Sequence, residues 1–494
     1  MATHTTEGER YLHVLAVPFP AQGHLTPLMR FCKLLLKHYQ NRGSLRVTFL
    51  DFYPPNDSAD HSFSFKFHHD RLLQRVRFPF PNFSQQLPSL QTFFDSLLCI
   101  ESGLHQLIQF FNCHGLPVTC LVTDFMTTFP TQDVADKLGI SRIALFTLSA
   151  SRLLLINYAS QNDTFSIEQV MDAINSTERR DEVFCDSVPG LPRLLNKDLP
   201  QFKHITDDTR TVWEFANRSW KACNSRAHAV VLNTFEELEP SACGLLSDDC
   251  DVPVYDVGLW IESLSGDTST SMREEDERCI GWLDQQPTSS VLYISFGSTT
   301  MLSKGQFEAL LHGVIDSKQR FLWVLRPGLI DDIDYCSASK EIISRSENRG
   351  FVVDWAPQLR VLSHSSVGGF LSHCGWNSTI ESIANGVPIL CWPYFADQHM
   401  NARFIVDEWR MGLQFKHTGE GGYLVESYEI ETAIRSLMEG KEGSILRKNA
   451  HALKQKSSQC FESSGSSLLK LDALIKDMET SIQCGTVSSS SCKS

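Results

Sequence analysis

Residues 355–398 read WAPQLRVLSHSSVGGFLSHCGWNSTIESIANGVPILCWPYFADQ. Two short apolar runs in this stretch, Val367–Leu371 and Pro388–Trp392, are typical of buried strands. A polar turn and a segment with a helical pattern separate the two runs. Strands that are joined through a helix pair in parallel. This stretch therefore predicts part of a parallel sheet.

The same alternation of apolar runs and helical patterns extends in both directions from this stretch. The further runs typical of strands are His13–Val17, Leu45–Phe52, Val118–Val122, Arg142–Phe146 and Ala229–Leu232 in the first half, and Val291–Phe296, Phe321–Leu325 and Gly350–Val353 in the second. Strands that alternate with helices predict parallel sheets with helices on both faces. Two such series predict two doubly wound α/β domains.

The composition between the two series changes sharply. Residues 263–277 read SLSGDTSTSMREEDE and contain almost no apolar side chain, which is typical of a linker. We therefore expect a first domain over 1–260, a linker over 261–280 and a second domain over 281–460. Helical periodicity near the end predicts a C-terminal helix over 461–482 that packs on the first domain. The serine-rich residues 483–494 are expected to be disordered.

Charge and composition exclude several classes of protein. The chain has 494 residues and a net charge of −14, which argues against a nucleic-acid or anionic-membrane partner. We see neither a secretory signal nor an uninterrupted apolar stretch of membrane-spanning length, so no membrane insertion is expected. The 15 cysteines form no CxxC pair, which favours reduced thiols and a cytoplasmic location.

Several nucleotide and metal motifs are absent. The sequence contains no GxGxxG, GxxxxGK[ST], GxSxG or HExxH, which argues against dinucleotide oxidoreductases, P-loop NTPases, α/β-hydrolases and zincins. Two acidic triplets, Asp249–Asp251 and Asp332–Asp334, could hold a divalent cation on a nucleotide diphosphate. We favour the alternative that both are solvated, turn-rich segments.

Polar residues gather where predicted strands end. These are Gln22–His24, Asp124, Gly297–Ser298 and His373–Ser378. Ligands of open parallel sheets bind beyond the carboxyl ends of the strands, so we expect these residues to meet in one site.

Residues 355–398 closely resemble the 44-residue signature box of the plant family 1 UDP-dependent glycosyltransferases. The resemblance extends to FPAQGH at 19–24, VTDF at 122–125, LNTFEELE at 232–239 and FGS at 296–298, so it covers nearly the whole chain. It implies the GT-B fold, in which two Rossmann-like domains face a cleft. The implied activity is transfer of glucose from UDP-glucose to a hydroxyl or carboxyl group of a small lipophilic plant metabolite.

The resemblance assigns the catalytic pair. His24 would remove the proton of the acceptor, and Asp124 would orient His24 and stabilise its charge. Direct attack opposite to UDP would invert the donor and give a β-glucoside.

The resemblance also assigns the donor site. Trp355 would stack on uracil, Glu381 would hold the ribose, and Asp397 and Gln398 would bind the sugar, with Gln398 typical of glucose donors. The remaining donor-binding residues are Ala356, Gln358 and Trp376, a weaker match at Thr147, and the diphosphate contacts Ser298, His373, Gly375, Asn377 and Ser378. A helix N-terminus there would take the place of a metal, so we expect neither metal nor cofactor. Residues 378–381 also fit a capping box, an alternative explanation for Ser378 and Glu381.

The acceptor is the open question. The aromatic residues Phe63, Phe65, Phe67, Phe78, Phe80 and Phe83 could line an apolar pocket for a flavonoid or another phenolic. The alternation within 62–67 fits an ordinary strand equally well, and terpenoid or hormone acceptors stay open. A membrane-bound glucuronosyltransferase and a catalytically weak nucleotide-sugar binding protein are the rival hypotheses. We expect a monomer.

Overall fold

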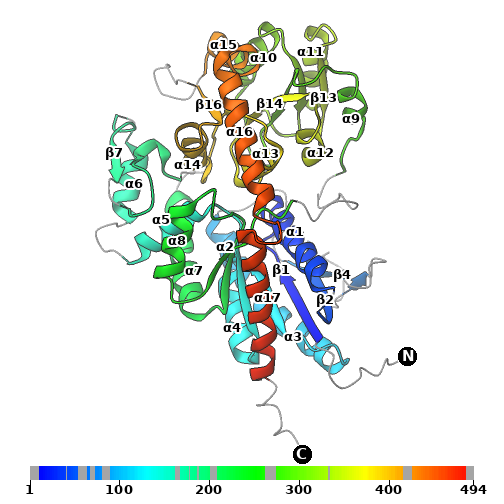
Figure 1. Ribbon diagram of the computed structural model, residues 1–494, viewed down its shortest axis with the longest axis vertical. Coiled ribbons are helices and arrows are strands. Elements are labelled where there is room, and N and C mark those ends of the chain that lie inside the picture. Colours follow the sequence, from blue (N-terminus) through cyan, green and yellow to red (C-terminus); the bar gives the residue numbers. More distant parts are fainter. Residues whose placement is uncertain are drawn as a thin grey trace, which may run out of the picture.

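Parallel strands with helical crossovers build both halves of the chain, as the computed structural model shows (Figure 1). The structure describes residues 11–40, 42–53, 64–66, 73–80, 90–161, 167–176, 178–185, 188–200, 208–261, 274–331, 334–415 and 425–485. Most of the predicted linker (262–273) and the end of the predicted tail (486–494) lie outside these residues.

The first half forms an eight-stranded sheet in the order β10-β9-β6-β5-β1-β2-β4-β3. Only β3, at the edge, is antiparallel to its neighbour. The strands are β1 (Tyr11–Val17), β2 (Ser44–Tyr53), β3 (Ser64–Lys66), β4 (Leu73–Pro79), β5 (Cys120–Asp124), β6 (Ser141–Phe146), β9 (Ala229–Leu232) and β10 (Val254–Asp256), besides a small hairpin of β7 (Val183–Cys185) and β8 (Leu194–Leu195). The helices are α1 (Gln22–Tyr39), α2 (Leu90–Leu98), α3 (Ile100–Cys113), α4 (Thr128–Leu138), α5 (Ala150–Gln161), α6 (Ile167–Asn175), α7 (Asp208–Arg226) and α8 (Pro240–Asp249).

The second half forms a six-stranded parallel sheet in the order β13-β12-β11-β14-β15-β16. Its strands are β11 (Val291–Ser295), β12 (Arg320–Val324), β13 (Gly350–Val353), β14 (Val367–Ser372), β15 (Ile389–Cys391) and β16 (Gly412–Gln414). Its helices are α9 (Arg278–Leu283), α10 (Lys304–Asp316), α11 (Tyr335–Arg345), α12 (Gln358–Leu362), α13 (Trp376–Asn385), α14 (Gln398–Arg403), α15 (Ser427–Glu439) and α16 (Lys441–Gln459), followed by α17 (Ser466–Gly485). Two parallel α/β sheets were predicted, and the structure confirms them.

Alternating side chains of β1 serve two separate cores. Val14 and Ala16 pack with α1, whereas Leu15 and Val17 pack on the other face with α2 and α3. Helices on both faces explain why the strand reads as a continuous apolar run. Every predicted run is a strand, with ends shifted by one or two residues. The sequence pattern does not predict β4, whose polar residues interrupt the apolar run, or short strands such as β10 and β16.

In each sheet the strand order changes direction at one point, because successive strands are added first on one side of a central strand and then on the other. This point lies between β1 and β5 in the first sheet and between β11 and β14 in the second. Loops diverge there, so the carboxyl ends of the strands leave a crevice. A cavity of about 810 Å³ lies between the two crevices and is lined by residues from both halves. The topology therefore fixes where a ligand can enter.

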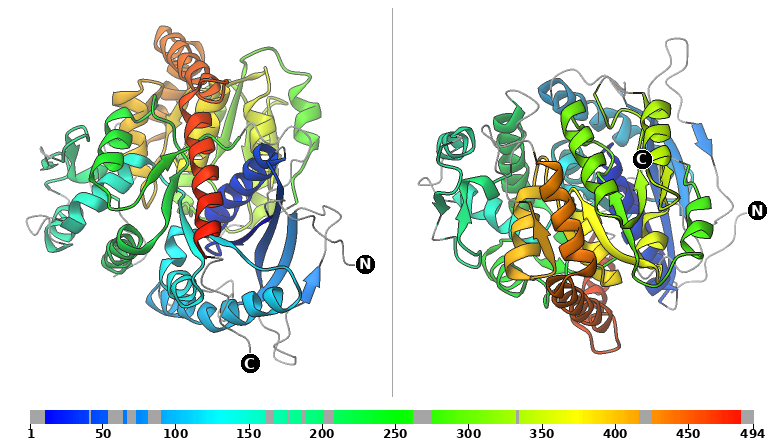
Figure 2. Two further views of the ribbon diagram at one scale, coloured as in Figure 1. Left: turned by 60° about the horizontal axis from the view of Figure 1, so that its bottom comes forward. Right: turned by 90° about the horizontal axis from the view of Figure 1, so that it is seen from above.

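The last helix returns to the first sheet. Figures 1 and 2 show α17 running beside α1, away from α15 and α16, which pack with the second half. Leu471, Leu474, Ile475 and Met478 are buried in the core that β1 and α1 share. The helix continues to Gly485, three residues into the segment that was predicted to be disordered. In the described part of the chain, no helix combines the length and apolar character that a membrane crossing requires.

A buried ion pair joins the two halves across the cavity. Arg30 of α1 lies 2.7 Å from Glu381 of α13, measured from Nη1 to Oε1, and both side chains are at most 7% exposed. Nearby, Asn377 donates its side-chain amide to the carbonyl oxygen of Gly23 at 2.7 Å. These contacts set the start of α13 against the start of α1.

Replacing Leu474 by alanine is expected to lower the free energy of unfolding by about 2–5 kcal/mol, because it opens a cavity in the core of the first half. Leu469 on the same helix is 57% exposed, so Leu469→Ala should change the free energy of unfolding by less than about 0.5 kcal/mol. Denaturant titration followed by circular dichroism measures both. Equal losses of stability in the two variants would mean that α17 does not bury Leu474 in the core of the first half.

Replacing Arg30 by leucine leaves the Glu381 carboxylate buried without its cation, and we expect a loss of about 3 kcal/mol of stability. The double variant Arg30→Leu/Glu381→Leu removes both charges and should regain most of that loss. Thermal denaturation of the two variants and the native chain checks this. A double variant no more stable than Arg30→Leu would contradict the assignment of the loss to the uncompensated charge of Glu381.

Candidate active site

His24 and Asp124 meet although 100 positions separate them in the chain. His24 lies in the first turn of α1, directly after β1, and Asp124 is the last residue of the adjacent strand β5. Nδ1 of His24 is 2.9 Å from Oδ2 of Asp124. The other oxygen, Oδ1, accepts the backbone N–H of Met126 at 2.8 Å, so the carboxylate is held on both sides.

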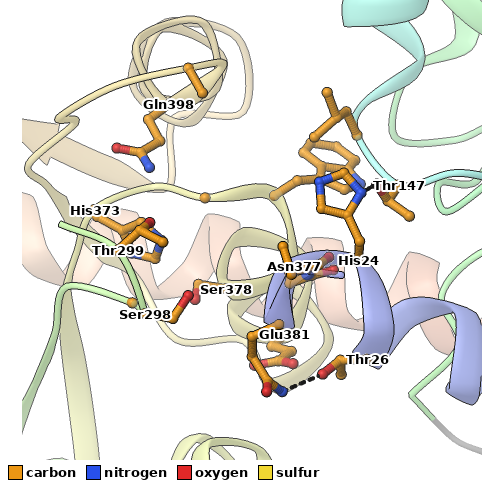
Figure 3. A pocket seen from close by; sticks show the side chains of 18 of the residues that line it. His24, Thr26, Thr147, Ser298, Thr299, His373, Asn377, Ser378, Glu381 and Gln398 are labelled. Carbon is orange, nitrogen blue, oxygen red and sulfur yellow. Dashed lines mark hydrogen bonds between the residues drawn. The ribbon is translucent and has the colours of Figure 1, made fainter. Parts of the chain in front are cut away.

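The surroundings of His24 favour its protonated form. Burial by itself lowers the pKa of His24, but the charge and hydrogen bond of Asp124, together with the charge of Asp397, outweigh burial and raise it. Because Nδ1 faces Asp124, Nε2 is the nitrogen available to exchange a proton with a ligand. The Thr147 hydroxyl lies 3.2 Å from the same Nδ1 (Figure 3). Thr147, predicted to contact the donor sugar, therefore contacts the imidazole.

Among the helices that begin near the cavity, α5 and α13 differ at their N-termini. Glu239 accepts the first N–H groups of α5, from Ala150 at 3.0 Å and Ser151 at 2.9 Å. At α13 the N-cap is Gly375, and no side chain caps the helix. Unpaired N–H groups and the helix dipole attract an anion. The start of α13 is therefore suited to bind a phosphate.

Two glycines bring backbone close to the imidazole of His373. A Cβ on Gly297 would lie 2.6 Å from Nε2 of His373, and one on Gly375 would lie 2.5 Å from it. Gly297 also has a φ of +70°, which other residues adopt rarely. Burial lowers the pKa of His373 to about 4, so the ring is neutral at neutral pH. Its Nδ1 is buried without a hydrogen-bond partner among the described residues.

Gln358 connects the residues beyond this turn. Its Nε2 donates to the Ser378 hydroxyl at 2.9 Å and to Oε2 of Glu381 at 2.7 Å. The Tyr293 hydroxyl donates to Oε1 of Gln358 at 3.2 Å. The capping-box explanation is wrong, because α13 begins at Trp376 and Ser378 is already its third residue. Ser378 and Glu381 instead line the cavity.

Asp397 and Gln398 follow a loop at the opposite side of the cavity. Oε1 of Gln398 accepts the backbone N–H groups of Tyr394 and Phe395, at 2.8 and 3.0 Å, which leaves its Nε2 as a donor. Asp397 accepts from Nδ2 of Asn401 at 2.8 Å, and burial raises its pKa. This pair offers a donor and an acceptor side by side, as polyhydroxylated ligands require.

Trp376 and Trp355 have different surroundings. The Trp376 indole is 3% exposed and donates to the Asn233 carbonyl at 3.0 Å, so it also packs the two halves together. Trp355 and Ala356 also line the cavity, and the carbonyl oxygen of Trp355 accepts the backbone N–H of Asp276 at 2.9 Å.

The cavity is lined by every residue that was predicted to be catalytic or donor-binding.

The aromatic run predicted to line an acceptor pocket does not do so where the structure describes it. Phe78 and Phe80 are at most 2% exposed and belong to the core between the first sheet and α2 and α3. Phe65 lies in β3, which supports the strand alternative, and Phe63, Phe67 and Phe83 lie outside the described residues. The apolar wall near His24 comes from other segments, namely Phe19, Phe94, Phe125, Met126, Phe146, Leu148, Ile156 and Val212.

Some charged residues of the cavity were not predicted from the sequence. Arg30, Arg152 and Glu275 line it, but they belong to helices or loops without a recognisable motif. Burial raises the pKa of Glu275, which lies near the Arg30–Glu381 pair. Only the spacing of Arg30 from His24, within one helix, could have indicated its place.

The acidic triplets show other roles. Asp334 caps α11 by accepting the N–H groups of Cys336 and Ser337, and Asp332 lies outside the described residues. Asp251 pairs with the side chain of Asn224. Across the described ranges, no three His, Cys, Asp or Glu side chains are grouped so that they could hold a metal ion.

Comparisons with known proteins identify the family of the chain. Residues 219–454 match the family model described as UDP-glucoronosyl and UDP-glucosyl transferase. The chain is 31% identical over 506 residues to UDP-glycosyltransferase 85A7 from Arabidopsis thaliana, covering 96% of this chain and 98% of that protein. It is 32% identical over 488 residues to the 7-deoxyloganetin glucosyltransferase of Gardenia jasminoides, covering 92% and 95%.

A solved structure extends the agreement to three dimensions. The structure of Phytolacca americana UGT2, complexed with UDP-2fluoro-glucose and pterostilbene, superposes with a TM-score of 0.75. The two proteins are 29% identical, and the match covers 95% of this chain and 100% of that one. These findings confirm the family and the fold that the sequence predicts. The chain belongs to the plant family 1 UDP-glycosyltransferases and is a GT-B glycosyltransferase that takes its sugar from a UDP-sugar donor.

Proposed function

We propose that this enzyme transfers glucose from UDP-glucose, with inversion and without a metal, to a hydroxyl group of a small, largely apolar plant metabolite. The observation that carries the proposal is the cavity itself. It places the His24–Asp124 pair opposite the uncapped start of α13, with an apolar wall on one side. Acceptor, base and donor can therefore meet in this one cavity.

His24 is the general base in this proposal. Nε2 takes the proton of the acceptor hydroxyl while Asp124, bound to Nδ1, stabilises the imidazolium that forms. The acceptor oxygen forms a bond to C1 of glucose, and the bond from C1 to the diphosphate oxygen breaks. Because the two oxygens lie on opposite faces of C1, an α-linked donor gives a β-glucoside.

The leaving diphosphate gains negative charge as this bond breaks. The N–H groups at the start of α13 and the neutral His373 can donate to its oxygens, with Ser298 from the facing loop. Preorganised donors of this kind stabilise developing charge without moving. They supply the electrostatic role that a metal has in other transferases.

The other donor contacts follow from the same geometry. Trp355 and Ala356 hold uracil at the far end of the cavity, and Glu381, fixed by Arg30 and Gln358, accepts the ribose hydroxyls. Asp397 and Nε2 of Gln398 bind the hydroxyls of glucose.

The apolar wall supports a phenolic acceptor, the class to which a flavonoid belongs. Phe19 packs on His24 with ring centroids 4.8 Å apart, so an aromatic acceptor would find an aromatic surface beside the base. The relative named for 7-deoxyloganetin favours a terpenoid as the second candidate. Both are flat or compact apolar molecules with a hydroxyl.

The test is product formation from UDP-glucose, a mixed panel of phenolic and terpenoid alcohols, and excess EDTA, followed by mass spectrometry. A product that gains one hexose is expected from the native enzyme, and His24→Ala should lose it while binding UDP with unchanged affinity. If the native enzyme forms product without EDTA but not with it, the transfer depends on a metal. Transfer by His24→Ala at the native rate would exclude His24 as the base.

The acid limb of kcat/KM should report His24. Neutral imidazole is the active form, so activity is lost as pH falls through a pKa that the charge of Asp124 holds above the ordinary histidine value. Asp124→Asn removes that charge, so the limb should move to lower pH, while turnover falls by about a hundredfold or more because the imidazolium loses its partner. An aliphatic alcohol acceptor keeps substrate titration out of the profile. If the acid limb of kcat/KM does not move in Asp124→Asn, the limb reports the titration of a group other than His24.

A further inference from the structure

A second buried charge lies near the base and has no part in the proposed chemistry. Arg152 is in the first turn of α5, one helical turn before Ile156, and both line the cavity. Side chains four positions apart lie on the same face of a helix, so the guanidinium and the apolar wall are adjacent. This face belongs to the first half of the chain, the half that supplies His24.

Arg152 is packed but not neutralised. Its side chain is 4% exposed, and its guanidinium stacks on the ring of Trp213 at 4.1 Å. Nη1 is buried and has no hydrogen-bond partner among the residues that the structure describes. Burial lowers the pKa of Arg152 to about 10, so it remains a cation at neutral pH. An unpaired donor on a buried cation is unfavourable unless a ligand completes it.

The other arginines that line the cavity are already paired. Arg30 is held by Glu381 at 2.7 Å, and Arg360 by Glu277 at 2.6 Å. Asp397 is the carboxylate whose charge acts on Arg152, but within the described ranges the two form no ion pair within 4 Å. Asp397 instead accepts from Asn401. Arg152 is thus available to a ligand.

We propose that Arg152 binds a carboxylate carried by the acceptor, so that the preferred acceptors are small apolar hydroxy acids. A carboxylate matches the planar guanidinium and can accept two parallel hydrogen bonds. The carboxylate stays ionised and unchanged, and only the hydroxyl reacts at His24. This inference rests on the proposed function and narrows its acceptor class.

The position of Arg152 favours the acceptor over the sugar as the source of the carboxylate. Arg152 shares a helix face with Ile156, and both belong to the first half of the chain, as does Val212. The apolar body of an acceptor acid can therefore pack on this wall while its carboxylate meets Arg152.

The experiment compares hydroxycinnamic and hydroxybenzoic acids with their methyl esters as acceptors of glucose from UDP-glucose. The native enzyme should prefer each acid by about tenfold or more in kcat/KM, and alkaline hydrolysis should leave the glucoside intact, which shows that the hydroxyl reacted. Arg152→Met should bring the ratio of acid to ester close to one, and Arg152→Lys should keep part of it.

Arg218→Met is the matched control. Arg218 also stacks on an aromatic ring, 5.1 Å from the centroid of Phe129, but it is exposed and does not line the cavity. This variant should keep the native ratio. Because the native enzyme is measured first, its own ratio tests the proposal even if Arg152→Met does not fold.

Three results would overturn the inference. Esters used as well as acids by the native enzyme would exclude a carboxylate site. An equal loss for acids and esters in Arg152→Met would mean that Arg152 serves Asp397 or the donor. Transfer from UDP-glucuronate that disappears in Arg152→Met would place the carboxylate on the donor. Transfer to neither acids nor esters nor any other alcohol contradicts the proposed function itself, which distinguishes the two failures.

Discussion

All parallel strands of a sheet end at one edge, and in this protein two such edges face each other across a cavity. The rest of the site depends on that constraint. It places His24 and Asp124 after neighbouring strands, and it places the start of α13 opposite them. The Arg30–Glu381 pair then fixes how closely the two edges approach. A site assembled in this way needs few residues from any single segment, which is why the reacting groups come from positions far apart in the chain.

The strands and most of the donor site were predictable because each depends on local sequence. Apolar runs bounded by turns identified every strand of five residues or more except β4, which polar residues interrupt. His373, Glu381 and Gln398 lie in one continuous motif, so their common location followed from the sequence alone. The capping-box alternative at Ser378 fails for a physical reason. A capping box requires only local spacing, but the helix has its N-cap three residues earlier, at Gly375, where the imidazole of His373 occupies the space that a larger residue would need.

The acceptor side could not be predicted, because it depends on distant contacts. Phe78 and Phe80 had the right composition for a pocket but point into the core between the sheet and α3. The actual wall combines single residues from loops and helices that share no motif. The same holds for Arg152, whose surroundings come from α7 and from the loop that carries Asp397. The structure shows that Arg152 is buried without an ion-pair partner among the described residues, and burying such a charge is unfavourable. In the sequence, nothing distinguishes Arg152 from the other arginines.

The return of α17 to the first sheet has a consequence for how the chain is made. The core around β1 and α1 includes Leu471, Leu474 and Met478, which follow the whole second half in the chain and are therefore synthesised after it. Until they leave the ribosome, the apolar face that α17 covers has no intramolecular partner. The second half can complete its own sheet earlier, although it begins later. The first half therefore closes only after the second half has been synthesised, and until then its uncovered apolar face must be kept from contact with other proteins.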